Sequence, residues 1–96
     1  MMMTRTEQVF IPVHHPSFAG HFPHYPIVPG ALLLELIGMA WGQPMTAVPR
    51  VKFLQPVLPG DELMIQFTAG ATQTAVQFIC QRGAVLVCTG LLQYAD

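Results

Sequence analysis

The sequence predicts an α+β fold in which an antiparallel sheet curls around one long central helix. One segment, residues 31–41, is rich in helix formers and apolar on nearly every face. The residues from 48 to 94 divide into short segments of strand character, separated by glycine and proline turns. A helix that is apolar all round is expected to be buried all round, and a sheet wrapped around it would provide that cover.

The first part of the chain is predicted to be one strand followed by a long loop. Residues 7–13 have strand character. Residues 14–30 contain four prolines, four histidines and two glycines, a density that predicts a loop with a fixed path. Pro29 stands where a helix tolerates proline in its first turn, so we expect the helix over 31–41, with Pro44 closing it.

The rest of the chain is expected to complete the sheet with four strands. Leu63, Ile65 and Phe67 recur at every second position, which is the period of a strand with one buried face. A Pro- and Gly-containing turn over 56–61 opens this strand. The four strands are predicted at residues 48–54, 63–69, 74–82 and 84–94.

Length and composition predict a single domain, residues 1–96, that associates with a second copy. Hydrophobic residues make up 52% of the chain and charged residues only 9%, whereas about 25% charged residues are usual in a globular domain. A monomer of this composition would expose large apolar patches, which usually mark an interface. A homo-oligomer is therefore expected, most simply a two-fold dimer.

The same sequence argues against a membrane protein and a nucleic-acid-binding protein. The longest apolar stretch, residues 27–41, is interrupted by Pro29 and Glu35 and is shorter than the roughly 20 residues that cross a bilayer. The N-terminal residues lack the apolar core of a secretory signal, so we expect a soluble cytoplasmic protein. A net charge of −1 provides no basic surface for nucleic acid. Cys80 and Cys88 are expected to be buried thiols.

Glu35 is the first candidate for chemistry, because it is the only acid between Glu7 and Asp61 and is embedded in leucines. Burial disfavours the charged form of a carboxylate, which raises its pKa and makes it able to donate a proton near neutral pH. Two other interpretations stay open from its position alone. Glu35 could reach solvent at the helix edge, or it could form a structural ion pair.

His21 and Gly30 are two further candidates. Prolines around His21 would hold its imidazole in one orientation, as a general base requires. A backbone N–H at Gly30, at the start of the helix, could polarise a thioester carbonyl. The alternatives are a loop histidine satisfied by backbone groups and a glycine needed only for the turn. A metal site is not favoured, because the four histidines form no metal-binding motif.

These residues resemble the signature of the β-hydroxyacyl–acyl carrier protein dehydratases of the FabA/FabZ type. The resemblance lies in GHFP at 20–23 and PIVPGALLLE at 26–35, with fourteen positions from His21 to Glu35 as in the family pattern. It continues in VKFLQPVLPGD at 51–61 and extends loosely to the last strands. It therefore covers most of the chain, and a contiguous motif of this length is far more specific than any single residue.

The resemblance implies a hotdog fold and a dimer with its active site at the interface, where His21 of one subunit faces Glu35 of the other. His21 would remove the α-proton, Glu35 would help the β-hydroxyl leave as water, and the N–H of Gly30 would hold the thioester oxygen. Glutamate at position 35 resembles the branch that only dehydrates. No metal or nucleotide cofactor is implied. Candidate acyl-tunnel residues are Phe22, Leu33, Met39 and Trp41.

The sequence departs from the family at His24, where glycine is usual, and at Met39, where glutamine is frequent. In the family the segment before the PVLPGD motif is often basic and helps to dock the acyl carrier protein, whereas here only Arg50 and Lys52 are basic. The resemblance therefore predicts a compact member of the family, shorter than the housekeeping enzymes.

We therefore expect a dehydratase acting on an acyl carrier protein or CoA thioester in fatty-acid, polyketide or aryl-polyene-like synthesis. The alternatives are a non-catalytic acyl-binding subunit of a heteromeric dehydratase and a thioesterase on the same fold. Association beyond the dimer is left open.

Overall fold

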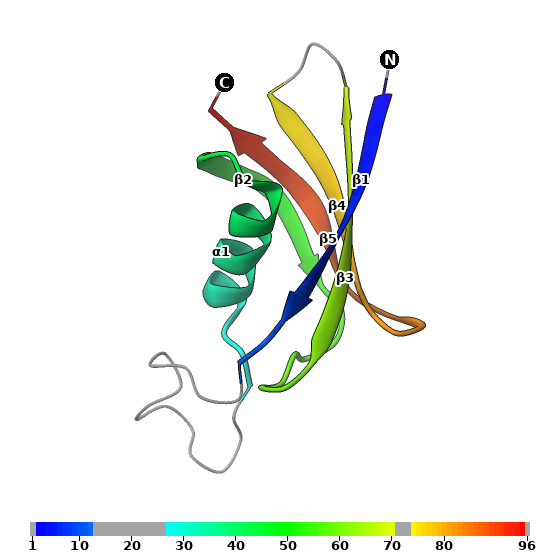
Figure 1. Ribbon diagram of the computed structural model, residues 1–96. Coiled ribbons are helices and arrows are strands. Elements are labelled where there is room, and N and C mark those ends of the chain that lie inside the picture. The colour runs from blue at the N-terminus through cyan, green and yellow to red at the C-terminus, as the bar shows by residue number, and fades with distance from the viewer. Residues whose placement is uncertain (1, 13–26, 71–73, 96) are drawn as a thin grey trace.

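In the part of the chain that the structure describes, five antiparallel strands form one sheet, and one helix packs against one of its faces (Figure 1). The computed structural model describes residues 2–12, 27–70 and 74–95. The elements are β1 Met2–Phe10, α1 Gly30–Trp41, β2 Met45–Phe53, β3 Glu62–Gly70, β4 Ala75–Arg82 and β5 Val85–Tyr94. The strand order is β1-β3-β4-β5-β2, so β1 and β2 are the edges. The predicted α+β layout is confirmed.

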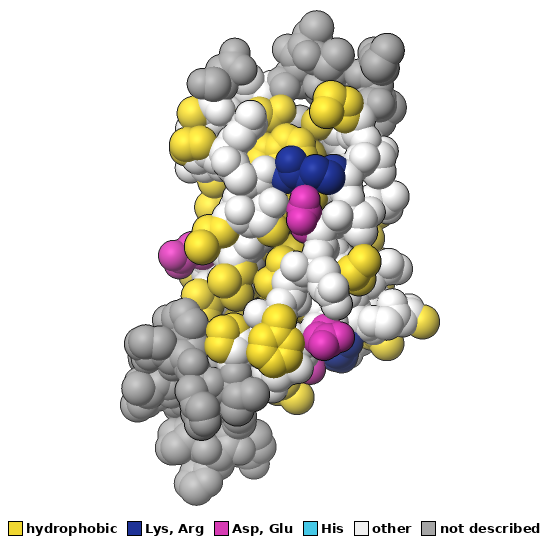
Figure 2. Space-filling model, in the orientation of Figure 1, with side chains coloured by type: hydrophobic (Ala, Val, Ile, Leu, Met, Phe, Trp, Pro, Cys, Tyr) yellow, Lys and Arg dark blue, Asp and Glu magenta, His cyan; other side chains and the backbone are white. Residues whose placement is uncertain are grey.

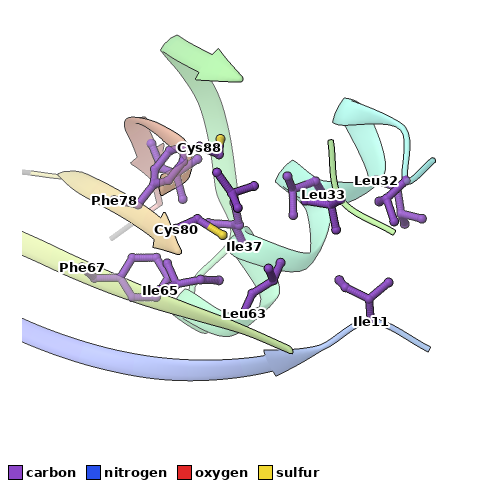
Figure 3. Close-up of a cluster of buried hydrophobic side chains, with 14 of the residues drawn as sticks. Ile11, Leu32, Leu33, Ile37, Leu63, Ile65, Phe67, Phe78, Cys80 and Cys88 are labelled. Atoms are coloured by element: carbon purple, nitrogen blue, oxygen red, sulfur yellow. The ribbon is translucent and has the colours of Figure 1, made fainter. Parts of the chain in front are cut away.

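Alternating apolar residues of the inner strands form the core, as the period of two predicted. Leu63, Ile65 and Phe67 of β3 are fully buried, and they lie beside Phe78 and Cys80 of β4. Side chains of α1 close this cluster from the other side (Figure 3). The buried residues of the described chain are all apolar, so hydrophobic burial of this layer supplies the main stabilisation of the fold.

The helix is less enclosed than the sequence predicted. It begins at Gly30 and ends at Trp41, and only Leu32, Leu33, Ile37 and Gly38 are buried. Ala31, Glu35 and Met39, spaced four residues apart, form an exposed face. The expectation of burial on every face is wrong for the single chain, because the sheet covers only the opposite side of the helix.

The two edge strands differ most from their predicted bounds. β1 was expected over 7–13 but runs from Met2 to Phe10, because it pairs with β3 along its whole length. Residues 4–6 of this strand, Thr-Arg-Thr, are all polar, so the alternation of apolar and polar residues that predicts a strand is absent there. β2 begins at Met45, three residues earlier than expected, and its register with β5 shifts on either side of Ala47. The second shift spans Pro49, which lacks an N–H and is tolerated at a sheet edge.

The turn over 56–61 brings together segments that are far apart in the sequence. The N–H of Ile11 donates to the carbonyl of Asp61 at 2.9 Å, and the N–H of Gly60 donates to the carbonyl of Ile11 at 2.8 Å. The N–H of Val28 donates to the carbonyl of Val57 at 2.8 Å. Gly60 has a φ of 91°, which favours glycine. The turn thus holds the end of β1 and the residues that lead into α1.

Arg5 of β1 holds the other end of the helix. Its guanidinium donates to the carbonyl oxygens of Ala40 and Trp41, in the last turn of α1. It also stacks on the Trp41 ring, 4.4 Å from the ring centroid. Gly42 ends the helix in the left-handed region, with φ 91°, and its N–H donates to the carbonyl of Gly38. A cation at a helix C-terminus is stabilised by the exposed carbonyl groups there.

Replacing Arg5 by alanine is expected to lower the free energy of unfolding by about 1–2 kcal/mol, because the helix loses its cationic cap and the stacking on Trp41. Urea denaturation measures this change. Glu7 forms an exposed ion pair with Arg5 at 3.2 Å, and the Glu7→Gln control is expected to change stability by less than about 0.5 kcal/mol. Equal losses in the two variants would contradict the capping role.

The two buried thiols predict a fall in stability at alkaline pH. Cys80 and Cys88 lie opposite each other on β4 and β5, and both are free thiols. Burial raises the pKa of Cys80 to about 12, with a contribution from nearby Cys88, and burial raises that of Cys88 to about 11. Their stabilising contribution is complete below the unfolded pKa of 9.0. It is lost as the pH rises toward the folded values, because the unfolded chain then binds fewer protons.

Urea denaturation at neutral pH and at a pH of about 10.5 tests this linkage. The wild-type chain is expected to lose more stability over this interval than a variant in which Cys80 and Cys88 are both alanine. The same loss in both proteins would assign the alkaline destabilisation to other groups.

Candidate active site

Glu35 lies on the exposed face of α1, beside an open hollow of about 460 Å³. The hollow is lined mostly by apolar groups from the second half of the helix and the connection to β2: Gly38, Met39, Gly42, Gln43, Pro44 and Met45. No hydrogen bond or ion pair joins the Glu35 carboxylate to another residue in the described ranges. Of the interpretations that the sequence left open, the single chain shows Glu35 reaching solvent at the helix edge. Its desolvation requires a further surface that covers this face.

Gly30 begins the helix beside a second hollow, also of about 460 Å³. A Cβ atom on Gly30 would lie 2.8 Å from Cζ of Phe53, so the absence of a side chain lets that ring approach the helix start. No side chain caps the helix at Pro29, and α1 has no acidic residue in its first turn. The first N–H groups of a helix have no partner within it and carry partial positive charge. This end of α1 can therefore stabilise developing negative charge on an oxygen.

Each hollow lies where α1 approaches one end of β2. Gly30 approaches Phe53 at one end of β2, and an added Cβ on Gly38 would lie 3.5 Å from Sδ of Met45 at the other. Gly30 and Glu35 therefore line two separate hollows along the same helix. A helix N-terminus that can polarise a carbonyl, a carboxyl group and apolar walls together suit a reaction at a carbonyl compound with an apolar chain.

Of the other predicted site residues, some line one of the two hollows and others do not. His21 and Phe22 lie outside the described residues. Leu33 is buried at 3% exposure and also lines the hollow at Gly30. Met39 is 70% exposed and lines the hollow at Glu35. Trp41 lines neither hollow, because its ring packs on Phe67 and Tyr94 with centroids 5.1 and 5.3 Å apart.

The structure adds Met45 and Phe53 of β2 to the candidate site. Periodicity predicted Phe53 only as part of a strand, and it did not predict that Met45 belongs to one. Their position beside the helix depends on β2 lying at the sheet edge next to β5, which no local pattern encodes.

Arg50 and Lys52 lie on the outer face of the sheet, away from α1. They line a shallow hollow of about 380 Å³ together with residues of β4 and β5 such as Ile79 and Thr89.

The described residues contain no cluster of three or more histidine, cysteine or acidic side chains that could hold a metal ion. The four histidines of the sequence lie outside the described residues. No helix in the described part of the chain is long and apolar enough to cross a membrane.

Curated proteins with similar sequences match most of the chain. FabZ, the 3-hydroxyacyl-acyl-carrier-protein dehydratase, of Vibrio vulnificus (strain YJ016) is 33% identical over 96 residues, covering 84% of this chain and 58% of the relative. FabZ of Streptococcus uberis is 31% identical over 90 residues, covering 80% and 58%. The chain therefore matches 58% of the length of these curated relatives.

Solved structures share the fold at low sequence identity. The dehydratase heterocomplex ApeI:P from Xenorhabdus doucetiae has a TM-score of 0.79 at 20% identity, covering 97% of this chain and 88% of that chain. The fluoroacetyl-CoA thioesterase FlK has a TM-score of 0.74 at 15% identity, covering 97% and 84%. These likenesses confirm the predicted hotdog fold.

The model of the ApeI-like family, described as ApeI dehydratase, matches residues 3–91. This match includes α1, the turn over 56–61 and nearly all of the sheet. The chain therefore belongs to the ApeI-like dehydratase family, within the hotdog fold.

Proposed function

We propose that the chain catalyses the reversible dehydration of a 3-hydroxyacyl thioester to a trans-2-enoyl thioester. The observation that carries the proposal is that Glu35 lines an apolar hollow and lies on the same helix as Gly30, whose backbone N–H has no partner within that helix. The family model and the FabZ relatives support this reaction class. The proposed pathway is fatty-acid, polyketide or aryl-polyene-like synthesis.

The proposed elimination needs one base, one acid and one site for the thioester oxygen. His21 removes the α-proton, and the N–H at Gly30 stabilises the negative charge that moves onto the thioester oxygen. Glu35 donates a proton to the β-hydroxyl, which leaves as water while the Cα–Cβ double bond forms. The base then holds one additional proton and the acid holds one fewer, and proton exchange with solvent restores both.

We propose that the active unit is a homodimer in which the open face of α1 is covered. The face around Glu35 and Met39 is exposed in the single chain, and the edge strand β2 exposes Met45 and Phe53. Hydrophobic side chains are exposed on the surface in Figure 2, with few charged ones among them. A second copy would cover this apolar surface and shield the Glu35 carboxyl group from solvent.

A heteromeric dehydratase is the second candidate. It is favoured by the family model, described as ApeI dehydratase, together with the fold likeness to the ApeI:P heterocomplex. In that case the open face of α1 would receive a different hotdog chain.

Arg50 and Lys52 are the residues proposed to receive an acidic acyl carrier protein, since both line the hollow on the outer sheet face. Two cations would attract such a partner weakly and in a salt-dependent way. The cytoplasmic location stays a prediction.

Replacing Glu35 by glutamine is expected to lower the rate of enoyl thioester formation by about 10²–10⁴-fold, because the amide cannot donate the proton as an acid does. The measurement follows the ultraviolet absorbance of the enoyl product from a 3-hydroxyacyl N-acetylcysteamine thioester. His21→Ala is expected to lose a similar fraction of the rate.

Glu62→Gln is the matched control, because Glu62 is an exposed acid on β3, outside both hollows. It is expected to keep the wild-type rate. Activity that survives in Glu35→Gln would rule out the assigned acid. Release of free thiol in place of enoyl product would favour the thioesterase alternative.

Replacing Met45 by lysine is expected to shift the protein from dimer to monomer, because a charge would be buried in the proposed interface. Analytical ultracentrifugation measures the mass against the 10.5 kDa of one chain. Met64→Lys is the matched control, since Met64 is 46% exposed and lies on β3, away from β2. A wild-type monomer that gains activity only with a second hotdog chain would support the heteromeric alternative.

A further inference from the structure

Asp61 and Arg82 form a hydrogen-bonded ion pair at the turn over 56–61. Arg82 Nη1 lies 2.9 Å from Asp61 Oδ2 and donates to the Pro56 carbonyl at 3.0 Å. The same Asp61 Oδ2 accepts the backbone N–H of Leu58 at 2.9 Å. The side chains are 18% exposed for Asp61 and 34% for Arg82, so solvent screens this cluster less than it screens the Arg5–Glu7 pair.

The bond from Leu58 to Asp61 fixes one particular peptide plane. The N–H of Leu58 and the carbonyl of Val57 belong to the same planar peptide unit. That Val57 carbonyl accepts the N–H of Val28 at 2.8 Å. The Asp61 carboxylate therefore fixes the orientation of the 57–58 peptide unit. Through the Val57 carbonyl, this peptide unit holds Val28, two positions before Gly30.

Val28 transmits this constraint to the start of α1. Its side chain is 5% exposed and packs in the same core cluster as Val57, which is 2% exposed. Pro29 follows Val28, and its carbonyl accepts the first hydrogen bond of the helix, from the N–H of Leu33 at 3.0 Å. A rotation of the 57–58 peptide would move Val28 and, with it, the direction in which the Gly30 N–H points.

We propose that Asp61, oriented by Arg82, is a positioning residue that aims the Gly30 N–H at the thioester oxygen. This inference rests on the proposed dehydratase function and adds a role to the PVLPGD turn, which the reaction itself does not use. Neither side chain touches substrate in this arrangement. A small misorientation of a donor is sufficient to matter, because a displacement of about 1 Å can cost about 10²-fold in rate.

The experiment compares Asp61→Ala, Asp61→Asn and Arg82→Lys with the wild type, using the same 3-hydroxyacyl N-acetylcysteamine thioester. Asp61→Ala is expected to lower kcat by about 10–100-fold with KM changed by less than about threefold, since the donor is misaimed while the apolar hollows are intact. Asp61→Asn keeps an acceptor for the Leu58 N–H and is expected to recover most of kcat. Arg82→Lys keeps the charge and is expected to fall between them.

Two controls separate positioning from a general loss of stability. Arg5→Ala weakens the opposite end of α1 and is expected to destabilise the chain while keeping kcat per folded molecule. Glu62→Gln removes the neighbouring charge and is expected to be neutral. If Asp61→Ala keeps the wild-type kcat, or if Arg5→Ala loses as much kcat as Asp61→Ala, the positioning role is overturned.

Amide hydrogen exchange provides a readout that does not depend on activity. The Val28 and Leu33 amides, which donate to the Val57 and Pro29 carbonyls, are expected to exchange faster in Asp61→Ala than in the wild type, and Glu62→Gln is expected to leave them unchanged. A wild-type protein without dehydratase activity, but with this exchange pattern, would refute the proposed function and keep the link from Asp61 to α1. Unchanged exchange in Asp61→Ala would overturn the link itself.

Discussion

The contact between one face of α1 and the inner face of the sheet is the interaction on which the rest of the structure depends. Ile37 of the helix is fully buried, as are Ile65 and Phe67 of β3, and the buried residues of the described chain are all apolar. Because a helix has a fixed angular spacing of side chains, burying this face turns Glu35 toward the opposite side. The packing of the core thus decides where the candidate acid is presented.

Hydrophobic packing is not directional, so it cannot by itself fix the position of the helix along its axis. Polar contacts from distant segments do so at both ends. Arg5 of β1 binds the last carbonyl groups of α1, and the turn held by Asp61 binds Val28 just before its first residue. Hydrogen bonds depend on distance and angle, and they are therefore suited to hold the Gly30 N–H in one direction.

The exposed face of α1 and the small number of charges have one common physical explanation. A chain with 9% charged residues has few groups with which to solvate its surface, and the helix face at Met39 together with β2 remains apolar and uncovered in the single chain. A partner that covers this side would complete both hollows. The surface that associates with the partner would then also carry the catalytic residues, as the proposed dimer requires.

The sequence by itself determined the α+β layout, the helix over 31–41, the inner-strand alternation and the motif with Glu35 and Gly30, because these signals are local in the chain. Only the tertiary structure decided that Glu35 is exposed and that Phe53 lies against Gly30. It also decided that Gly90 must be small, since an added Cβ would lie 2.6 Å from the Arg50 carbonyl oxygen. Such contacts follow from strand order and register, which join segments far apart in sequence, and a local period carries no information about them.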